Sequence, residues 1–249
     1  MSALKSEYRL AALEAGAQAL DAALDGLDAA GAVRRVLAGI YPGESCVVSS
    51  FGAESAVILH LVAQAKPDTP VLFMDTGQLF DETLAYRNAL SERLGLSDVR
   101  TLSPNQDHLK ADDPDGVLHK TNPDLCCHIR KTLPLISALR PYKVWISGRK
   151  RHHGGDRAAL PRVEIQDGKL KLNPLFDWSR DQINAYFEAH DLPPHPMVAD
   201  GYPSIGCLPC TTQVSDPAED PRAGRWAGQD KTECGIHISE DGTITRTGG

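Results

Sequence analysis

Short apolar runs alternate with amphipathic stretches through the first two thirds of the chain. The apolar runs have the length and residue types of buried strands, and the stretches between them have helical spacing. The predicted strands are residues 46–49, 71–74, 99–102 and 144–147, and the predicted helices include 54–64 and 82–94. This order is typical of an α/β fold with a twisted parallel sheet and flanking helices. In such a sheet the ligand binds at the carboxyl ends of the strands.

Three regions are expected along the chain. Residues 1–40 have leucine and alanine at helical spacing, which predicts an N-terminal helical segment. Residues 41–215 form the predicted α/β domain, with a helix at 126–139 interrupted near its proline and a polar hairpin around Asp167. Residues 216–249 lack periodicity and contain several glycines, so we expect a mobile C-terminal tail.

The charge of the chain limits its ligands. The 249 residues have a net charge of -7, whereas nucleic-acid recognition usually needs a basic face, so we expect no nucleic acid partner. Two local basic clusters, at 149–157 and 222–225, favour a small anion instead. No apolar run approaches the ~20 residues of a membrane span. Because residues 1–20 also lack the layout of a secretory signal, we expect a cytoplasmic protein with no membrane partner.

A loop of small and hydroxyl residues follows the first predicted strand and opens a helix. Its sequence is Ser-Ser-Phe-Gly-Ala-Glu-Ser at 49–55, and backbone N–H groups at such a turn can bind phosphate. A plain strand-to-helix turn could have the same composition. A second polar loop after the next strand, at 75–77, favours the binding site. The predicted binding residues are Ser49, Ser50, Phe51, Gly52, Asp75, Thr76 and Gly77.

Four of the six cysteines form two pairs that are far apart in the sequence. Cys126 and Cys127 are adjacent, and Cys207 and Cys210 form a C-x-x-C pair. Four thiolates suit a 4Fe-4S cluster or a tetrahedral zinc ion, and adjacent cysteines favour the cluster because consecutive side chains diverge. Cys46 lies in a predicted core strand and is expected to be a buried apolar residue.

One further cysteine, Cys234, stands alone in the predicted tail. It lies near Lys231 and His237, and such neighbours lower a thiol pKa and make the sulfur more nucleophilic. Glycines at 228 and 235 would allow this segment to move over a ligand. An unreactive cysteine in a tail is the alternative when the segment is considered alone.

Taken together, these motifs resemble the adenosine 5′-phosphosulfate reductases, the iron–sulfur branch of the phosphoadenosine phosphosulfate reductase family. The resemblance rests on the cysteine spacing, the loop at 49–55, the run Asp-Thr-Gly-Gln-Leu-Phe-Asp-Glu-Thr from Asp75 and the terminal Glu-Cys-Gly-Ile-His. It implies an adenine nucleotide alpha hydrolase-like (Rossmann-like) fold in which residues 41–215 bind nucleotide and cluster. It also implies reduction of adenosine 5′-phosphosulfate to sulfite and AMP, with thioredoxin as the reducing partner. The oligomeric state stays open, a homo-oligomer included.

The resemblance assigns roles to individual residues. Cys234 is the implied nucleophile, and Lys131 and His237 are implied to assist it. The 4Fe-4S ligands are implied to be Cys126, Cys127, Cys207 and Cys210, and the substrate-binding arginines Arg149, Arg157, Arg222 and Arg225. The lid at 149–157 departs from the family, because Arg-His-His-Gly-Gly-Asp replaces the more common Arg-Asp-Gln-Ser.

Three alternatives stay open on the sequence. An ATP-consuming sulfurtransferase of the same fold would need a Ser-Gly-Gly-x-Asp-Ser loop, from which Phe51, Ala53 and Glu54 depart. A zinc-stabilised binding module would have no use for Cys234. Within the reductases, the substrate could carry a 3′-phosphate, although enzymes for that nucleotide generally lack the four cluster cysteines.

Overall fold

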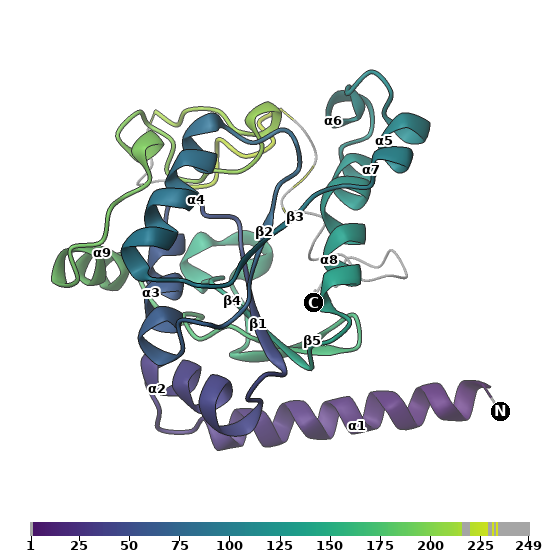
Figure 1. Ribbon diagram of the computed structural model, residues 1–249, viewed down its shortest axis with the longest axis vertical. Coiled ribbons are helices and arrows are strands. Elements are labelled where there is room, and N and C mark those ends of the chain that lie inside the picture. Colours follow the sequence, from purple (N-terminus) through teal and green to yellow (C-terminus); the bar gives the residue numbers. More distant parts are fainter. Residues whose placement is uncertain (1, 216–219, 229–230, 232, 234–249) are drawn as a thin grey trace.

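The computed structural model describes residues 2–215, 220–228, 231 and 233 (Figure 1). Its strands are β1 Ser45–Ser49, β2 Val71–Met74, β3 Val99–Leu102, β4 Val144–Ser147, β5 Val163–Gln166 and β6 Lys169–Leu172. They form one six-stranded sheet of order β3-β2-β1-β4-β6-β5. Neighbouring strands run parallel except for β5 and β6, which form an antiparallel pair. The α/β fold predicted from the sequence is confirmed, and so is the hairpin around Asp167.

Helices cover both faces of this sheet. The α-helices are α1 Ser2–Ala23, α2 Ala29–Arg34, α3 Ser55–Ala65, α4 Asp81–Leu94, α5 Gln106–Asp112, α6 Leu118–Thr121, α7 Pro123–Cys127, α8 Leu133–Leu139 and α9 Arg180–Ala189. Two further segments are π-helical, η1 Arg35–Ile40 and η2 His128–Thr132. The described residues also form four 3-10 turns: η3 Arg151–His153, η4 Gly155–Arg157, η5 Pro196–Val198 and η6 Leu208–Cys210. In Figure 1, α3, α4 and α9 lie on one side of the sheet and α8 on the other.

The side chains of each strand alternate between two hydrophobic cores. Val47, Phe73 and Ile146 contribute to the core under α3, whereas Cys46 and Trp145 belong to the core under α8. This follows from the two-residue period of a strand, which directs successive side chains to opposite faces. Cys46 is fully buried, and burial raises the pKa of its thiol, as expected of an apolar core residue.

Local signals explain where the covering helices begin and end. Helix α4 stops at Gly95, whose φ of 66° lies in the left-handed region that glycine adopts without a steric penalty. Helix α9 starts with a capping box, in which Ser179 and Gln182 satisfy each other's backbone N–H groups. The N-terminal helix α1 packs along β5 and β6, and its first turns project beyond the sheet (Figure 1).

The helical segment that carries Cys126 and Cys127 differs from the prediction. A break was expected near Pro134, but residues 123–139 form α7, η2 and α8 with helical backbone at each junction. Pro134 has no N–H to donate to the preceding turn, and the wider π turn just before it accommodates this loss. The helix therefore continues through the proline, and Lys131 lies within the π turn.

The strand order places a topological switch between β1 and β4. From β1 the chain proceeds through α3, β2 and α4 to β3 on one side, then crosses to β4 on the other side of β1. Loops from these two adjacent strands diverge at their carboxyl ends, and ligands bind in the resulting crevice of open α/β sheets. The fold thus predicts a site beside the loops that follow Ser49 and Ser147.

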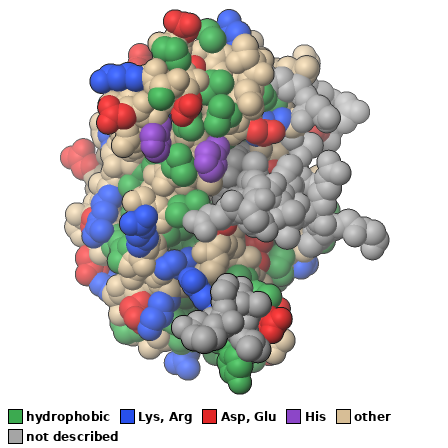
Figure 2. Space-filling model, turned by 90° about the vertical axis from the view of Figure 1, so that its right-hand side faces the viewer, with side chains coloured by type: hydrophobic (Ala, Val, Ile, Leu, Met, Phe, Trp, Pro, Cys, Tyr) green, Lys and Arg blue, Asp and Glu red, His purple; other side chains and the backbone are tan. Residues whose placement is uncertain are grey.

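The surface and the helices set two further limits. Basic and acidic side chains are interspersed on the face shown in Figure 2, apart from the grey residues. Among the described residues, no helix combines the length and the apolar character that crossing a bilayer demands.

The boundaries at residues 40 and 215 stay predictions. Within the expected tail, 220–228, 231 and 233 are described, whereas Cys234 and His237 lie outside the described residues.

Candidate functional site

A cavity of about 190 Å³ opens at the carboxyl ends of β1, β2 and β4, where the switch in strand order predicts it. Many of the predicted site residues line it. These are Ser49, Ser50, Gly52, Thr76, Lys131, Arg149, Arg157, Cys207, Arg222 and Arg225. Residues from six separate segments of the chain therefore face one cavity.

The loop after β1 is held in a strained conformation. Phe51 has a φ of 50°, which is uncommon for a residue with a side chain, and its N–H donates to Ser49 Oγ at 3.1 Å. Its ring is fully buried and packs edge-on against Phe73, with 5.4 Å between ring centroids. The ring thus anchors the loop in the core and does not line the cavity. At Gly52 an added Cβ would lie 3.1 Å from the carbonyl oxygen of Ile205, so this position has little room for a side chain.

The loop after β2 connects the sheet to the C-x-x-C segment. Asp75 accepts from the N–H of Gly77 at 2.9 Å, which closes the turn, and the side chain of Thr76 lies 3.3 Å from Cys207 Sγ. Leu79 and Cys207 form an antiparallel bridge. Asp75 and Gly77 therefore shape the loop, while Thr76 and Cys207 reach the cavity.

The two cysteine pairs meet behind this loop. Cys126, Cys127 and Cys207 are buried, and Cys210 is half-buried. Burial raises the pKa of the Cys126 thiol to about 11; the Arg130 guanidinium acts in the opposite direction, and negative charge on Cys207 and Cys210 would raise it too. Such coupling requires proximity, so the fold brings the two distant pairs together.

The spacing of the sulfur atoms distinguishes two kinds of metal site. A tetrahedral zinc ion with Zn–S bonds of about 2.3 Å would hold its sulfurs roughly 3.8 Å apart. In the part of the chain that the structure describes, no three cysteine sulfurs lie within 4.8 Å of one another. As they are placed, the described thiols therefore do not form the close tetrahedron of a single zinc ion.

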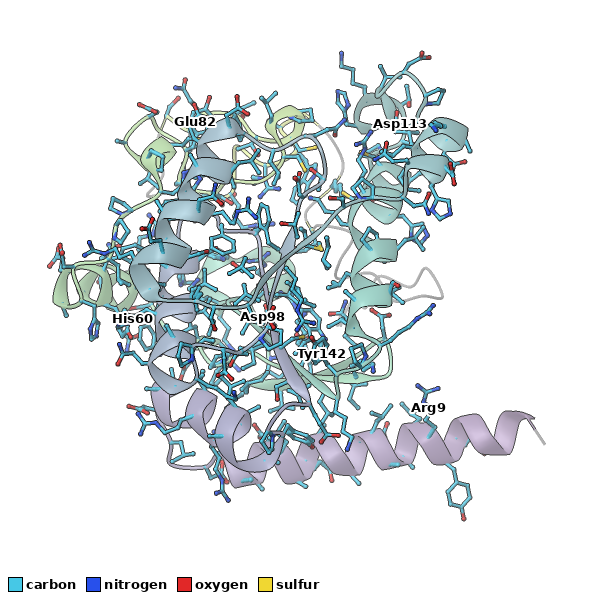
Figure 3. The ribbon with its side chains drawn as sticks, viewed as in Figure 1. Arg9, His60, Glu82, Asp98, Asp113 and Tyr142 are labelled. Carbon is cyan, nitrogen blue, oxygen red and sulfur yellow. The ribbon has the colours of Figure 1, made fainter. Side chains whose placement is uncertain are left out.

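A buried ion pair braces the helix that carries the cysteines. Arg130 donates to Asp113 at 2.6 Å and to the carbonyl oxygen of Thr76 at 2.9 Å. Asp113, labelled in Figure 3, also accepts from the N–H of Leu118 at 2.9 Å. Both charged side chains are almost completely buried, and an ion pair in such surroundings is costly to break. Arg130 thus joins the Thr76 loop and the α5–α6 connection to the cysteine helix.

Two arginines come from the described part of the predicted tail. Residues 220–226 run beside the C-x-x-C turn, where Thr211 bridges Arg225 and the Trp226 N–H donates to the carbonyl of Cys210 at 3.1 Å. The Arg225 guanidinium lies 4.5 Å from the centroid of the buried Trp226 ring, and Arg222 lies 5.8 Å from it. This packing directs cationic side chains to the cavity wall.

Several donors around the cavity lack acceptors. The Nε1 atoms of Trp145 and Trp226 and the Nε of Arg149 are buried and have no hydrogen-bond partner within the described ranges. All three residues line the cavity. Because buried donors are almost always satisfied, these N–H groups indicate a ligand rich in acceptor oxygens.

The lid after β4 is fastened to the loop after β1 by Glu54. Its carboxylate lies 2.7 Å from Lys150 Nζ, 3.0 Å from His153 Nε2 and 3.5 Å from His152 Nε2. Burial raises the pKa of Glu54, but the Lys150 ammonium and the two histidines outweigh it and hold the pKa far below the usual range. Neither Glu54 nor Lys150 was among the site residues predicted from the sequence. The signal was a single acid within a loop predicted to bind an anion.

Glu54, His152 and His153 also have the composition of a cation site, but their hydrogen bonds oppose it. The Arg157 guanidinium can only donate, so His153 Nδ1, 3.0 Å from Arg157 Nη1, must accept. The ring proton therefore lies on Nε2 and is donated to Glu54, which leaves no lone pair there for a metal. The adjacent Lys150 ammonium would also repel a cation.

Arg157 lines the cavity and contacts the described end of the chain. Its Nε and Nη2 both donate to the carboxylate of Glu233, and its Nη1 donates to His153. The predicted substrate ligand therefore has each of its guanidinium nitrogens in contact with a protein group. Glu233 was not singled out by the sequence analysis, although it directly precedes Cys234.

The fold and the site define an adenine nucleotide alpha hydrolase-like protein, with a crevice for an anionic ligand at the β1/β4 switch. Residues 44–213 match the family described as the phosphoadenosine phosphosulfate reductase domain. Relatives at 38–50% identity over most of the chain bear the name adenosine 5′-phosphosulfate reductase. The chain belongs to the phosphoadenosine phosphosulfate reductase family, as the motifs predicted.

Individual relatives and structures agree with this assignment. A protein named adenosine 5′-phosphosulfate reductase from Chelativorans sp. is 50% identical over 196 residues, which cover 79% of this chain and 80% of the relative. The protein of the same name from Mesorhizobium japonicum is 45% identical over 225 residues, or 90% of this chain and 88% of the relative. The phosphoadenylyl-sulfate reductase of Candida auris, solved as a phosphate complex, shares the fold with a TM-score of 0.65 at 23% identity, covering 80% of this chain and 96% of that one.

Proposed function

We propose that this protein is an adenosine 5′-phosphosulfate reductase, which converts the nucleotide to sulfite and AMP with thioredoxin as reductant. One observation carries the proposal. Buried donors without acceptors and cationic side chains line one cavity at the nucleotide-binding edge of the sheet. The names of the relatives, which share up to 50% of their residues with this chain, support the same substrate.

The walls of the cavity suit the parts of this substrate. Backbone N–H groups of the loop after Ser49, at the start of α3, would bind the phosphate. The side chains of Lys131, Arg149, Arg222 and Arg225 would hold the sulfate. Cations at this place would offset the repulsion between sulfate oxygens and an incoming thiolate, and removing one such contact typically costs about 10²–10³ in rate.

The proposed reaction needs one nucleophile of this chain and one external dithiol. The Cys234 thiolate attacks the sulfur of the nucleotide, an S–Cys234 bond forms, and the bond from sulfur to the bridging oxygen breaks to release AMP. A thioredoxin thiolate then attacks the Cys234 sulfur and displaces sulfite. The second thioredoxin thiol resolves the mixed disulfide, so thioredoxin supplies two electrons and becomes oxidised. Such a reductant places the reaction in the cytoplasm, where thiols stay reduced.

The cysteine quartet fits a 4Fe-4S cluster. Cys126, Cys127, Cys207 and Cys210 offer four thiols from two segments, which is the number of thiolates that a 4Fe-4S cluster takes. When bound, such a cluster would supply iron–thiolate bonds that cross-link the α7 helix to the η6 turn. The chain itself contributes the buried Arg130–Asp113 pair, which holds α7 in register with the Thr76 loop.

Sulfite release tests the proposed activity directly. Purified protein with thioredoxin and adenosine 5′-phosphosulfate should release sulfite, and Cys234→Ser should abolish it. Cys46→Ala is the matched control, because that thiol is buried in the core under α8. Pyrophosphate release from ATP without sulfite release would instead identify an ATP-consuming enzyme of the same fold.

The choice between two nucleotides needs a separate comparison. A relative from Gloeobacter violaceus, 40% identical over 196 residues, is named phosphoadenosine 5′-phosphosulfate reductase. We expect kcat/KM to be higher for the nucleotide without the 3′-phosphate, measured side by side at equal thioredoxin. A higher value for the 3′-phosphorylated nucleotide would overturn this choice of substrate and leave the reaction type standing.

A further inference from the structure

The carboxylate of Glu233 is clamped by the lid. Arg157 Nη2 lies 3.0 Å from Oε2 of Glu233, and its Nε donates to the other oxygen. Arg222 Nη2 lies 3.6 Å from Oε2. The Arg157 and Glu233 side chains are only 11% and 12% exposed. A two-pronged guanidinium–carboxylate pair that is largely withdrawn from water is the strongest and most directional ion pair that side chains make.

The orientation of the Arg157 side chain is fixed by His153. His153 accepts from Arg157 Nη1 through Nδ1 and donates through Nε2 to Glu54, at 3.0 Å in each case. Burial holds the pKa of His153 at about 4, so its Nδ1 lone pair is available near neutral pH. A continuous chain of contacts thus runs from Glu54 on the loop after β1, through His153 and Arg157, to Glu233.

A second anchor lies two residues earlier. Lys231 pairs with Asp124 of α7, the helix that carries Cys126 and Cys127, and its side chain is 6% exposed. Glu233 pairs with the lid. Lys231 is therefore attached to the cysteine helix and Glu233 to the lid. Cys234 follows directly, and consecutive Cα atoms are about 3.8 Å apart.

We propose that Glu233 is a positioning residue for the sulfur-transfer step, docked on Arg157 in an orientation that His153 fixes. The proposal rests on the proposed function. It assigns Arg157 to the enzyme's own carboxylate, in place of the sulfate of the substrate. The reason is geometric: Glu233 occupies two nitrogens of the guanidinium and His153 the third.

Binding and transfer respond differently to this arrangement. Loss of the Arg157–Glu233 pair leaves the cavity cations at Lys131, Arg149 and Arg225 in place, so nucleotide affinity should change by less than about three-fold. Misplacing a reacting group by about 1 Å can cost 10²-fold in rate. Transfer of the sulfo group to Cys234 should therefore slow by about 10- to 100-fold.

Single-turnover kinetics on the cluster-loaded protein separate the two effects. Glu233→Gln, Arg157→Lys, His153→Leu and the double variant Glu233→Gln/Arg157→Lys are mixed with excess nucleotide, without thioredoxin. The sulfo adduct is followed by mass spectrometry, and the nucleotide Kd is measured in a Cys234→Ser background. We expect slower adduct formation at near-constant Kd, with the double variant no slower than the worse single one. Asp98→Asn removes the half-buried partner of the exposed Arg100 and is the control that should match wild type.

Three results would overturn the assignment. A weakened Kd with an unchanged transfer rate would make Arg157 a substrate ligand, and additive losses would show that Arg157 and Glu233 act independently. Hydrogen exchange of peptides that contain Lys231 and Glu233 tests docking without any turnover, and Glu233→Gln should speed it. Wild-type protein that forms no adduct would refute the proposed function, whereas wild-type rates in Glu233→Gln would refute only the role of Glu233.

Discussion

Glu54 and Lys150 form an ion pair, 2.7 Å apart, that joins the loop after β1 to the lid after β4. The Lys150 side chain is 3% exposed, so its charge has almost no contact with water. Burial lowers the pKa of Lys150 more than the Glu54 carboxylate raises it, and Lys150 Nζ also donates to the carbonyl oxygen of Gly148 at 2.9 Å. The two loops, which both line the cavity, are thus fixed to each other by charge.

Removing the Glu54 charge should destabilise the protein substantially. Glu54→Gln leaves the Lys150 ammonium buried without its counter-charge, and breaking a buried pair in this way typically costs about 3–5 kcal/mol. The Glu44–Lys143 pair has the same 2.7 Å separation but is exposed to water, so Glu44→Gln should destabilise the protein far less. Urea unfolding of the two variants measures the contrast, and equal losses would contradict it.

Metal analysis should find iron in the purified protein. We expect about four iron atoms per chain, little zinc and a broad iron–sulfur absorption band. Cys126→Ser and Cys207→Ser should lose both the iron and the band, because each removes a thiolate from one of the two pairs. Cys46→Ala should keep them, since that cysteine lies in the core under α8. A colourless, zinc-loaded and fully active preparation would exclude the cluster.

A methyl group added at Gly206 should displace Arg225, one of the cationic side chains that line the cavity. A Cβ built at this glycine would collide with the guanidinium of Arg225, at distances that real Cβ atoms do not show. We expect Gly206→Ala to displace Arg225 and to lower kcat/KM by about 10²–10³. Gly16→Ala is the control, because its Cβ would meet only Leu170 Cδ1 at 3.9 Å. Near wild-type activity in Gly206→Ala would show that Arg225 is dispensable.

Stability should fall in mild acid through His195. This fully buried ring accepts from the N–H of Met197 at 3.3 Å and pairs with Thr83 at 3.1 Å. Burial lowers its pKa to about 4, and the nearby Glu82 carboxylate, labelled in Figure 3, only partly opposes this. Below about pH 6.5, His195 therefore binds a proton in the unfolded chain but not in the folded chain. As a result, folding is disfavoured progressively toward pH 4.

The expected loss from this histidine is about 2 kcal/mol between pH 7 and pH 5. His195→Asn keeps an acceptor for Met197 but does not titrate, so the difference in unfolding free energy between wild type and this variant should shrink by that amount. Chemical denaturation at a series of pH values measures it. A constant difference across the range would show that His195 does not carry the acid sensitivity.

Much of this fold could be predicted because its signals are local. The strands at 71–74, 99–102 and 144–147 were predicted at their observed bounds. The first and the last are buried strands, which appear in a sequence as short apolar runs between turn residues, whereas 99–102 is only partly buried and continues the alternation of strands and helices. The π turn at His128–Thr132 was not predicted. One proline in an apolar helix predicts a break, and the neighbouring turns decide whether the helix widens instead.

The sequence alone determined the α/β class, the strand-to-helix loop at 49–55 and the cysteine pairs, because residue type and spacing along the chain express each of them. The tertiary structure alone decided which charges meet. Glu54 and His153 are 99 residues apart, and Arg157 and Glu233 are 76 apart. Such pairs leave no periodic trace in a sequence, since a lone charged residue looks the same whether water or a distant partner surrounds it. Folding brings these residues together and excludes water from them. Without water their electrostatic attraction is stronger, and the resulting buried ion pairs hold the loops around the cavity together.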